Sequence, residues 1–292
     1  GIIDVCLKRA AAIDPMLLAV QWYKGNRYKT DITGCTAFDK RYECYKCCFD
    51  IINNKKALEM MISSTDELFH ICLYKKLMDD GKNELLLSLS TPHLKQFLKE
   101  NAPDQLWLYY CKHEDYAESA TKLYELATDE TKEYQLEDRI EWIKKVISLS
   151  RASGLDELQQ NAKCLLKYAN VQKIINQRVQ TLQNNKLEKV QNLFNISCSN
   201  GFWDLSLLIV NCTPIANEDR GKLISKLWTN FIEEQIWNDH LSVASQKISS
   251  LLLEIESESD ITNPNIIMPI LEEHKFRKNG AELWAVQTML KS

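Results

Sequence analysis

Glycine and proline are scarce in this chain. Its 292 residues include 8 Gly and 6 Pro, which is under about 3% of each, whereas usual frequencies are about 7% and 5%. Strand-rich sandwiches and barrels need many tight turns, and tight turns need both residues. Leu, Lys, Glu and Gln are abundant instead, and these residues favour helices. The composition therefore argues against an all-β fold and predicts an all-α one.

Long apolar runs and an excess of positive charge are also missing. No run of 18 apolar residues occurs and no signal peptide is visible, so we expect no transmembrane helix and no direct membrane insertion. Lys and Arg number 36 against 40 Asp and Glu, which gives a formal charge of −4. That balance provides no global positive field, so we expect no direct binding of nucleic acid.

Motifs of the common catalytic sites are absent. The sequence has no HExxH or GxSxG, and the lysines after Gly81 and Gly221 lack the other residues of a phosphate-binding loop. We therefore predict that the chain is not an enzyme and has no catalytic residues and no cofactor. A helical enzyme is the alternative, and it would need a deep pocket that joins Cys44 or Cys47 to a histidine and an acid.

Ten cysteines are present, mostly on apolar faces of helix-like segments. Free cysteine behaves as a small buried hydrophobe, which favours reduced thiols in a cytoplasmic or nuclear setting. Cys44, Cys47 and Cys48 share one helical face and are the strongest metal candidates. Structural zinc usually takes four ligands from two separated pairs, and no second CxxC or paired histidines occur. We interpret the three cysteines as packing residues and predict no metal site.

We also interpret the remaining aromatic, histidine and basic clusters as structural features and not as binding or catalytic sites. The stretch Met16–Lys29 mixes aromatic and basic residues, and we favour core packing of Trp22 and Tyr23 over a membrane or nucleic-acid surface. We expect His113 to be solvated or to cap a helix. The short basic clusters are interpreted as lysines at helix C-termini that complement the helix dipole; they lie at 55–56, 144–145 and 275–278.

Helical periodicity extends along the whole chain. The expected helices cover 2–12, 15–23, 38–52, a short segment ending at 61, 66–78, one beginning at 92, 103–111, 115–127, 136–152, 155–183, 187–199, 202–212, 217–236, 239–257, 264–275 and 280–290. We expect a loop over Tyr28–Ala37, a capping box of Ser64 and Glu67, an N-cap at Thr91 and a buried Trp107.

About sixteen helices with short connections and no βαβ alternation predict an irregular α-solenoid of stacked antiparallel helices without a β-sheet. A compact bundle is the alternative architecture. We expect one continuous solenoid over 1–292, with possible sub-blocks 1–62, 63–153 and 154–292. There is no initiator Met, and the first residues already follow a helical pattern, so we expect a segment of a longer protein.

Several segments match one family in order and spacing over residues 1 to about 236. Asp66–Tyr74 reads DELFHICLY and resembles DELF-x-x-ALY, Asp104–Tyr110 reads DQLWLYY and resembles DLLW-x-YY, and Leu136–Ile143 reads LEDRIEWI and resembles L-x-x-R-[LI]-E-Y-[IL]. Ser90–Leu94, Tyr116–Ala127 and Leu227–Glu234 fit further motifs of the family, as do Asp14-Pro15, Trp22–Lys24 and Phe38–Cys47. On these segments the chain resembles the large inner-ring scaffold nucleoporins of the 155/170 type.

This sequence departs from the family pattern at a few positions. Lys75 and Lys76 replace the more apolar end of the DELF segment, and His93 and Lys95 alter the turn around Pro92. The link over 53–65 is far shorter than the polar insertion that many relatives carry. None of these changes removes a reactive group, because we interpret the family's motif residues as packing residues.

The resemblance implies a C-terminal α-solenoid whose parent carries an N-terminal β-propeller that is not present here. It implies a structural scaffold of the nuclear pore complex inner ring, at the nuclear envelope, which supports pore assembly and nucleocytoplasmic transport. Implied partners are linear linker segments of a GLFG-repeat nucleoporin and the small membrane-associated linker nucleoporin, with pore-membrane proteins possible through the parent. The alternative is a helical adaptor or vesicle-coat-like solenoid that binds linear peptides. The partner-binding residues are not predicted.

Overall fold

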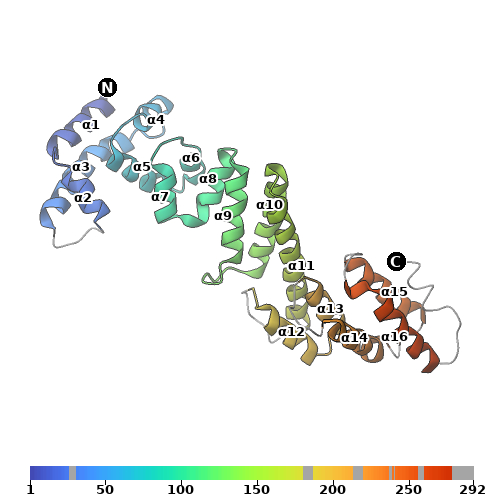
Figure 1. The fold of residues 1–292 in the computed structure, drawn as a ribbon. Helices are drawn as coiled ribbons and strands as arrows, with labels where there is room; N and C mark the ends of the chain where they lie inside the picture. The colour runs from blue at the N-terminus through green and yellow to red at the C-terminus, as the bar shows by residue number, and fades with distance from the viewer. Residues whose placement is uncertain are drawn as a thin grey trace. The chain divides into compact units, whose positions relative to one another are not determined.

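Helices make up almost the whole structure (Figure 1). The computed structural model describes residues 1–25, 31–179, 187–212, 220–236, 239, 241–255 and 260–277. Sixteen α-helices and no strand occur among these residues, in agreement with the predicted all-α solenoid. None of the described helices combines the length and apolar character needed to cross a bilayer.

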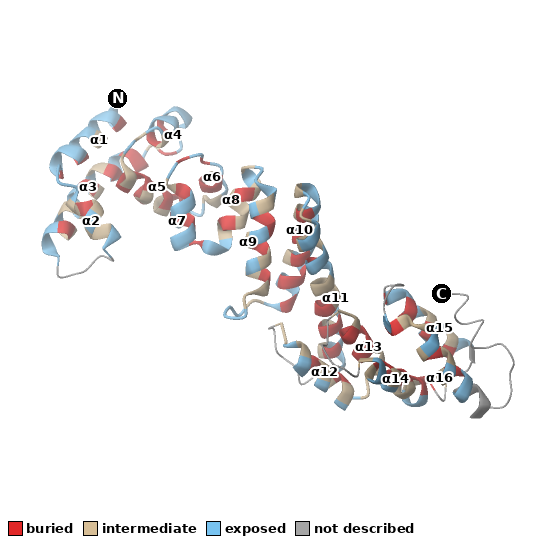
Figure 2. Ribbon diagram, in the orientation of Figure 1, coloured by how far each residue is buried: buried red, intermediate tan, exposed pale blue. Residues whose placement is uncertain are grey.

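The chain divides into two units, Gly1–Lys122 and Leu123–Ser292. In each unit the buried residues follow the faces where neighbouring helices meet (Figure 2). Each unit has its own hydrophobic cluster, one that includes Phe69, Leu73 and Leu98 and one that includes Leu207, Ile224 and Trp228. The subdivision into 1–62, 63–153 and 154–292 stays a prediction.

The first unit is a succession of short helices that pack on their neighbours. They are α1 (Ile2–Ile13), α2 (Leu18–Lys24), α3 (Ile32–Phe49), α4 (Lys55–Ile62), α5 (Glu67–Asp79), α6 (Asn83–Leu87), α7 (Leu94–Asn101), the 3₁₀ turn η1 (Pro103–Gln105), α8 (Leu106–Lys112) and the start of α9 (Tyr116–Thr128). Helices α1, α2 and α5 all pack against α3, and α7 packs against α5 and α8. Helix α3 is thus the centre of the first half of this unit.

The second unit begins with the helical hairpin of α10 (Leu136–Ser153) and α11 (Asp156–Arg178). Gly154 ends α10 with φ +71°, a left-handed conformation that favours glycine. The remaining helices are α12 (Val190–Ser199), α13 (Trp203–Cys212), α14 (Arg220–Asn230), the π-helical turn η2 (Phe231–Ile236), α15 (Leu241–Glu254), the 3₁₀ turn η3 (Asp260–Thr262) and α16 (Pro264–Arg277). Helix α13 packs against α11, α12 and α14, and α14 packs against α16.

The predicted loop over Tyr28–Ala37 is wrong in its second half, because α3 already begins at Ile32. Asp31 is its N-cap and accepts a hydrogen bond from the Gly34 amide at 2.9 Å. Gly34 also lets α2 approach closely, because a Cβ at this position would lie 2.5 Å from Cβ of Trp22. Glycine and threonine in this stretch suggested a loop, whereas tertiary packing keeps the glycine inside a helix.

The predicted caps at Ser64 and Thr91 are also wrong. Asp66 caps α5, and Ser64 accepts a hydrogen bond from the Asp66 amide instead. Helix α7 begins only at Leu94, and the buried Thr91 hydroxyl hydrogen-bonds the Tyr74 hydroxyl. Burial raises the pKa of Tyr74 to about 12, so this phenol stays neutral.

Helix ends and one aromatic differ from the prediction in smaller ways. Helix α11 ends at Arg178, before the predicted stop at 183, and α15 spans Leu241–Glu254, within the predicted 239–257. Trp107 is half-buried on α8, while its neighbours Leu106 and Tyr110 are buried. The helix predicted over 280–290 lies outside the described residues.

Candidate binding grooves

Within each unit, grooves open between neighbouring helices of the described part of the chain. The α1 groove has a volume of about 640 Å³ and is lined by Ile3, Asp4, Leu7, Lys8, Ala11, Leu17, Val20, Arg41, Met60 and Ser63–Glu67. The α7 groove, of about 760 Å³, is lined by Tyr23, Lys24, Glu67, Ile71, His93, Gln96, Phe97, Glu100 and Asn101. The α15 groove, of about 440 Å³, is lined by Ile174, Arg178, Asp204, Leu205, Leu208, Phe231, Gln235, Gln246, Lys247, Ser250, Leu251 and Glu254.

The α1 groove exposes apolar side chains at its walls. Leu17 is 53% exposed and Met60 is 45% exposed. Leu17 also has φ +56°, a left-handed conformation that is costly for a leucine. The Asp4–Lys8 ion pair at 3.0 Å lies on the same helix as the apolar residues Ile3 and Leu7, so this groove is mixed in character.

The α7 groove is the more polar of the two grooves in the first unit. Lys24 and Glu67 form an ion pair at 2.8 Å across it, and Nδ1 of His93 lies 4.0 Å from the same carboxylate. Phe97 and Ile71 supply its apolar surface. Lys24 and Glu67 offset each other, whereas the Glu100 carboxylate accepts a hydrogen bond from the neutral Gln96 amide and adds a negative charge to the groove.

The α15 groove has an apolar floor and a charged rim. Leu205, Leu208 and Leu251 form part of the floor, and Arg178 and Asp204 form an ion pair at 3.5 Å on the rim. Gln235 accepts a hydrogen bond from the Asp204 amide at 2.9 Å and donates one to its carboxylate at 3.0 Å. Gln235 belongs to the π-helical turn η2, and π-turns are frequent at functional sites.

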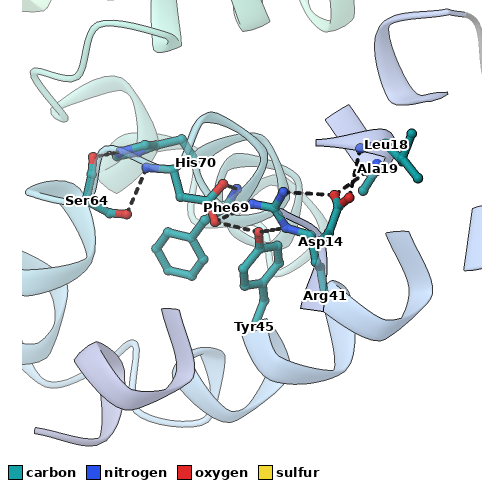
Figure 3. Close-up of polar contacts among 9 residues, drawn as sticks. Asp14, Leu18, Ala19, Arg41, Tyr45, Ser64, Phe69 and His70 are labelled. Carbon is teal, nitrogen blue, oxygen red and sulfur yellow. Dashed lines mark hydrogen bonds and ion pairs between the residues drawn. The ribbon is translucent and has the colours of Figure 1, made fainter. Parts of the chain in front are cut away.

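A buried ionic cluster holds the walls of the α1 groove together (Figure 3). Arg41 of α3 pairs with Asp14 at 3.2 Å and with Asp66 at 2.7 Å. Nε of Arg41 donates to the Tyr45 hydroxyl at 2.9 Å, and that hydroxyl donates to Asp66 at 2.6 Å. The cluster therefore ties the start of α2 and the start of α5 to the middle of α3.

Helix N-termini balance the charge of this cluster. Asp14 accepts hydrogen bonds from the Leu18 and Ala19 amides at the start of α2, and Asp66 accepts one from the Phe69 amide in α5. Each helix N-terminus carries the equivalent of about half a positive charge. Together with the guanidinium, two such termini offset two carboxylates, so the buried cluster is close to neutral.

Burial and neighbouring charges act on the same cluster in defined directions. Burial works against the charge of Arg41, but Tyr45 and Asp66 outweigh it and raise the pKa of the guanidinium. Burial and the Asp66 carboxylate both raise the pKa of Tyr45 above its ordinary range. Tyr45 is therefore a neutral donor and Arg41 a permanent cation, and their polar atoms hydrogen-bond each other and the two carboxylates.

His70 of α5 is buried beside this cluster. Nε2 of its ring hydrogen-bonds the Ser64 carbonyl at 2.7 Å, which requires a proton on that nitrogen. Burial lowers the pKa of His70 below its ordinary value of 6.5, although the bond to Ser64 acts in the opposite direction. The folded protein therefore keeps the imidazole neutral under conditions in which the unfolded chain takes up a proton.

This difference predicts a pH-dependent loss of stability. Protons bind the unfolded chain more strongly than the folded one between the lowered pKa and 6.5, so the free energy of unfolding falls as the pH falls through that window. We expect the His70→Asn variant to lose less stability than the wild type between pH 7.5 and pH 5.5, as measured by urea midpoints. The carboxylates titrate in both proteins and cancel in the comparison, so equal losses would contradict the prediction.

The cysteines singled out in the sequence lie at different depths. Cys48 is fully buried, Cys44 is half-buried and Cys47 is exposed on α3. For a fourth cysteine, Cys6 of α1, burial and the neighbouring Cys47 raise the pKa of the thiol above its ordinary value. In the described part of the chain no three His, Cys, Asp or Glu side chains are arranged to hold a metal ion.

The aromatic and histidine interpretations are partly confirmed. Trp22 and Tyr23 pack on Phe38 with ring centroids 5.2 and 6.2 Å apart, as core packing predicts. His113 is the C-cap residue of α8, in line with the second of its two expected roles, and its ring packs on Tyr109 at 4.3 Å. The basic residues of the 26–30 stretch lie outside the described residues, as does His240.

The interpretation of the short basic clusters is wrong for two of the three. Lys55 and Lys56 begin α4 and therefore lie at its N-terminus, and Lys144 and Lys145 lie in the middle of α10. These four are at positions where the helix dipole provides no support for a positive charge. Lys55, Lys56, Lys144 and Lys145 are all solvent-exposed, which explains why they are tolerated there.

Comparison with known proteins gives these features a context. The whole chain, residues 1–292, matches the family described as non-repetitive/WGA-negative nucleoporin C-terminal. A probable nucleoporin of Schizosaccharomyces pombe is 22% identical over 87% of this chain and 23% of its own length, and Nup154 of Drosophila melanogaster is 23% identical over 88% and 23%. The chain thus spans less than a quarter of the length of these relatives.

A solved structure has the same fold. The crystal structure of the Chaetomium thermophilum Nup170 CTD–Nup145N complex superposes with a TM-score of 0.79 and 20% identity, over 99% of this chain and 68% of that one. At this identity the likeness shows the fold, which is that of the Nup170 C-terminal solenoid. The chain therefore belongs to the non-repetitive, WGA-negative nucleoporin C-terminal family, as a solenoid segment of a 155/170-type scaffold nucleoporin of the nuclear pore complex at the nuclear envelope.

Proposed function

We propose that this chain is a non-catalytic scaffold segment of the inner ring of the nuclear pore complex, and that its α15 groove docks linear segments of other nucleoporins. In this way it supports pore assembly and nucleocytoplasmic transport. The observation that carries the proposal is the groove itself, with an apolar floor of leucines and a rim of charged and amide side chains. Stacked helices commonly bind extended segments by accepting apolar anchors in such grooves.

The solved relative supports the same kind of partner. The Nup170 C-terminal domain of Chaetomium thermophilum was crystallised together with another nucleoporin, Nup145N. For this chain we propose linear linker segments of a GLFG-repeat nucleoporin as the first partner class, and the small membrane-associated linker nucleoporin as the second. Such disordered segments wrap large surfaces with modest affinity per unit area, which suits an open groove.

The absence of catalysis is part of the proposal. In the first unit the buried Arg41 pairs with the buried Asp14 and with the partly buried Asp66, and both carboxylates also accept hydrogen bonds from helix amides. These contacts hold helices together and engage the charged atoms of all three side chains, so we assign them a structural role and not a catalytic one. The inner-ring location is tested by labelling the parent protein for electron microscopy of nuclear envelopes, where label at the outer rings would contradict it.

Peptide binding to the α15 groove gives the direct test. Overlapping fluorescent peptides that cover the linker segments of a GLFG-repeat nucleoporin are titrated with the chain and followed by fluorescence anisotropy. Ile174 is partly exposed in the groove, so the Ile174→Asp variant places a charge on apolar surface. We expect this variant to weaken the tightest peptide at least about tenfold, which corresponds to about 1.4 kcal/mol.

Val243 provides the matched control for this experiment. It is an apolar residue of similar exposure, on α15, and it does not line the groove. The Val243→Asp variant should bind the same peptide with unchanged affinity. If both variants lose affinity equally, or if no linker peptide binds the wild type, the α15 groove is not the docking site.

A further inference from the structure

The α1 groove and the α7 groove are neighbours in the first unit. Helices α2 and α5 pack against each other, and both grooves run beside them. Leu17 and Val20 line the α1 groove, whereas Tyr23 and Lys24, further along α2, line the α7 groove. Glu67, the first residue of α5, lines both grooves. The two grooves are therefore successive sections of one surface channel, which we call the α2–α5 track.

The α1 section of the track presents exposed apolar side chains, Leu17 and Met60, in a fixed arrangement. The left-handed backbone of Leu17 is a conformation that persists only where the surroundings enforce it. Asp14 enforces it, because its carbonyl accepts a hydrogen bond from the Leu17 amide at 3.2 Å. The Asp14 carboxylate also accepts hydrogen bonds from the Leu18 and Ala19 amides (Figure 3). This end of the track is thus a preformed apolar surface for an apolar side chain.

The α7 section of the track carries the surplus negative charge. The lysines and the arginine that line the track, Lys8, Lys24 and Arg41, already pair with carboxylates. Within the described part of the chain, Glu100 of α7 forms no ion pair and accepts a hydrogen bond only from the neutral Gln96 amide. Its carboxylate has room for further donors, and a guanidinium or an ammonium is the strongest of these. The charge of this section therefore favours a basic side chain.

We propose that the α2–α5 track docks an extended segment of a partner protein that carries an apolar residue and, at least about three residues away, a lysine or arginine. The spacing follows from α2, because Leu17 and Lys24 are about 10 Å apart along the helix, and an extended chain covers that distance in about three residues. The apolar residue packs at Leu17 and Met60. The basic head group pairs with Glu100, and its methylene stem packs on Phe97, which lies on the same side of α7.

The test begins with random peptides of about twelve residues that are selected on the immobilised chain. The Ile174→Asp variant separates the track from the α15 groove, since peptides of the track keep their affinity for this variant. The outcome is therefore independent of the proposed function. We expect the peptides that keep their affinity to share an apolar residue and a lysine or arginine. If no peptide keeps its affinity, or if those that do lack a basic residue, the proposal is wrong.

Variants at the apolar end locate these peptides on the track. The Met60→Asp variant places a charge on the apolar surface and should weaken the track peptides at least about tenfold in fluorescence anisotropy titrations. Ile32 is the matched control, because it is an exposed apolar residue of α3 that lines neither groove. The Ile32→Asp variant should bind with unchanged affinity. Equal losses in the two variants would overturn the proposal.

Charge reversal at the other end tests the selection for a basic residue. Each track peptide is compared with a version that has glutamate in place of its lysine or arginine. The wild type should prefer the basic peptide at least about tenfold, and the Glu100→Lys variant should prefer the glutamate version. Asp79→Lys is the control, at an exposed acid that ends α5 and lines neither groove. Circular dichroism establishes that each variant is folded, and an unchanged preference in Glu100→Lys would contradict the proposal.

Discussion

Replacing Arg41 by methionine is expected to lower the free energy of unfolding of the first unit by about 3–5 kcal/mol, because the change leaves one buried and one partly buried carboxylate without their cation. Arg41 is only 2% exposed and Asp14 only 3%. Methionine can fill much of the space of the side-chain stem, so the loss reflects charge rather than volume. Urea denaturation followed by circular dichroism measures the effect.

Lys46 supplies the control for the Arg41 prediction. It also lies on α3 and pairs with an acid, Glu43, at 2.6 Å, but both side chains are more than half exposed. Exposed ion pairs contribute about 0–1 kcal/mol, so the Lys46→Met variant should unfold almost as the wild type does. A loss below about 1 kcal/mol in the Arg41 variant would mean that water replaces the guanidinium and that the cluster does not hold the helices together.

Periodicity predicted the fold class, because each helix of a solenoid has to bury an apolar stripe against its neighbours. The stretch from Asp66 illustrates this success, since its apolar residues at three- and four-residue spacing are buried along α5. Local signals were less reliable at helix ends. Ser64 followed by Glu67 satisfies the capping-box pattern, yet Asp66 is the cap because its carboxylate also reaches Arg41.

The buried charges could not be predicted from local pattern. The interpretation of family motif residues as packing residues holds for Leu68 and Phe69, but Asp66 and Arg139 in those motifs are charged and act through hydrogen bonds. Arg41 stands among polar residues of α3, and nothing in its neighbourhood distinguishes it from an exposed arginine. Its partner Asp14 lies 27 residues away, and only the packing of α2 on α3 joins them.

The positions of the grooves could not be predicted from the sequence either. Leu205 and Leu208 of α13 have the periodicity of any core residue, and their place at the floor of the α15 groove depends on where α11 and α15 lie. The cysteines are an intermediate case. Their spacing on α3 indicated a shared face, whereas the fourth thiol, Cys6, comes from a helix that the spacing could not identify.

Arg139 of α10 is the second position where we expect a large effect. It is 1% exposed, and its guanidinium donates to the carbonyls of Ala127, Asp129 and Lys132 at 2.7–2.8 Å. The side chain thereby provides hydrogen-bond donors for carbonyls at the end of α9 and in the turn that follows it, which have no partner within the helix. Burial lowers the pKa of the guanidinium, and the nearby acids counteract this, so it remains charged.

The Arg139→Met variant should lose about 3–5 kcal/mol of unfolding free energy, because three carbonyls lose their charged donor inside the protein. Arg139→Lys should fall between this variant and the wild type, since an ammonium keeps the charge but cannot span three acceptors in the plane of a guanidinium. Arg151→Met, at an exposed position on the same helix, should change stability by less than about 1 kcal/mol. Thermal and urea unfolding measure the stability of the three variants. If the Arg139→Lys and Arg139→Met variants both had nearly the free energy of unfolding of the wild type, this role for Arg139 would be wrong.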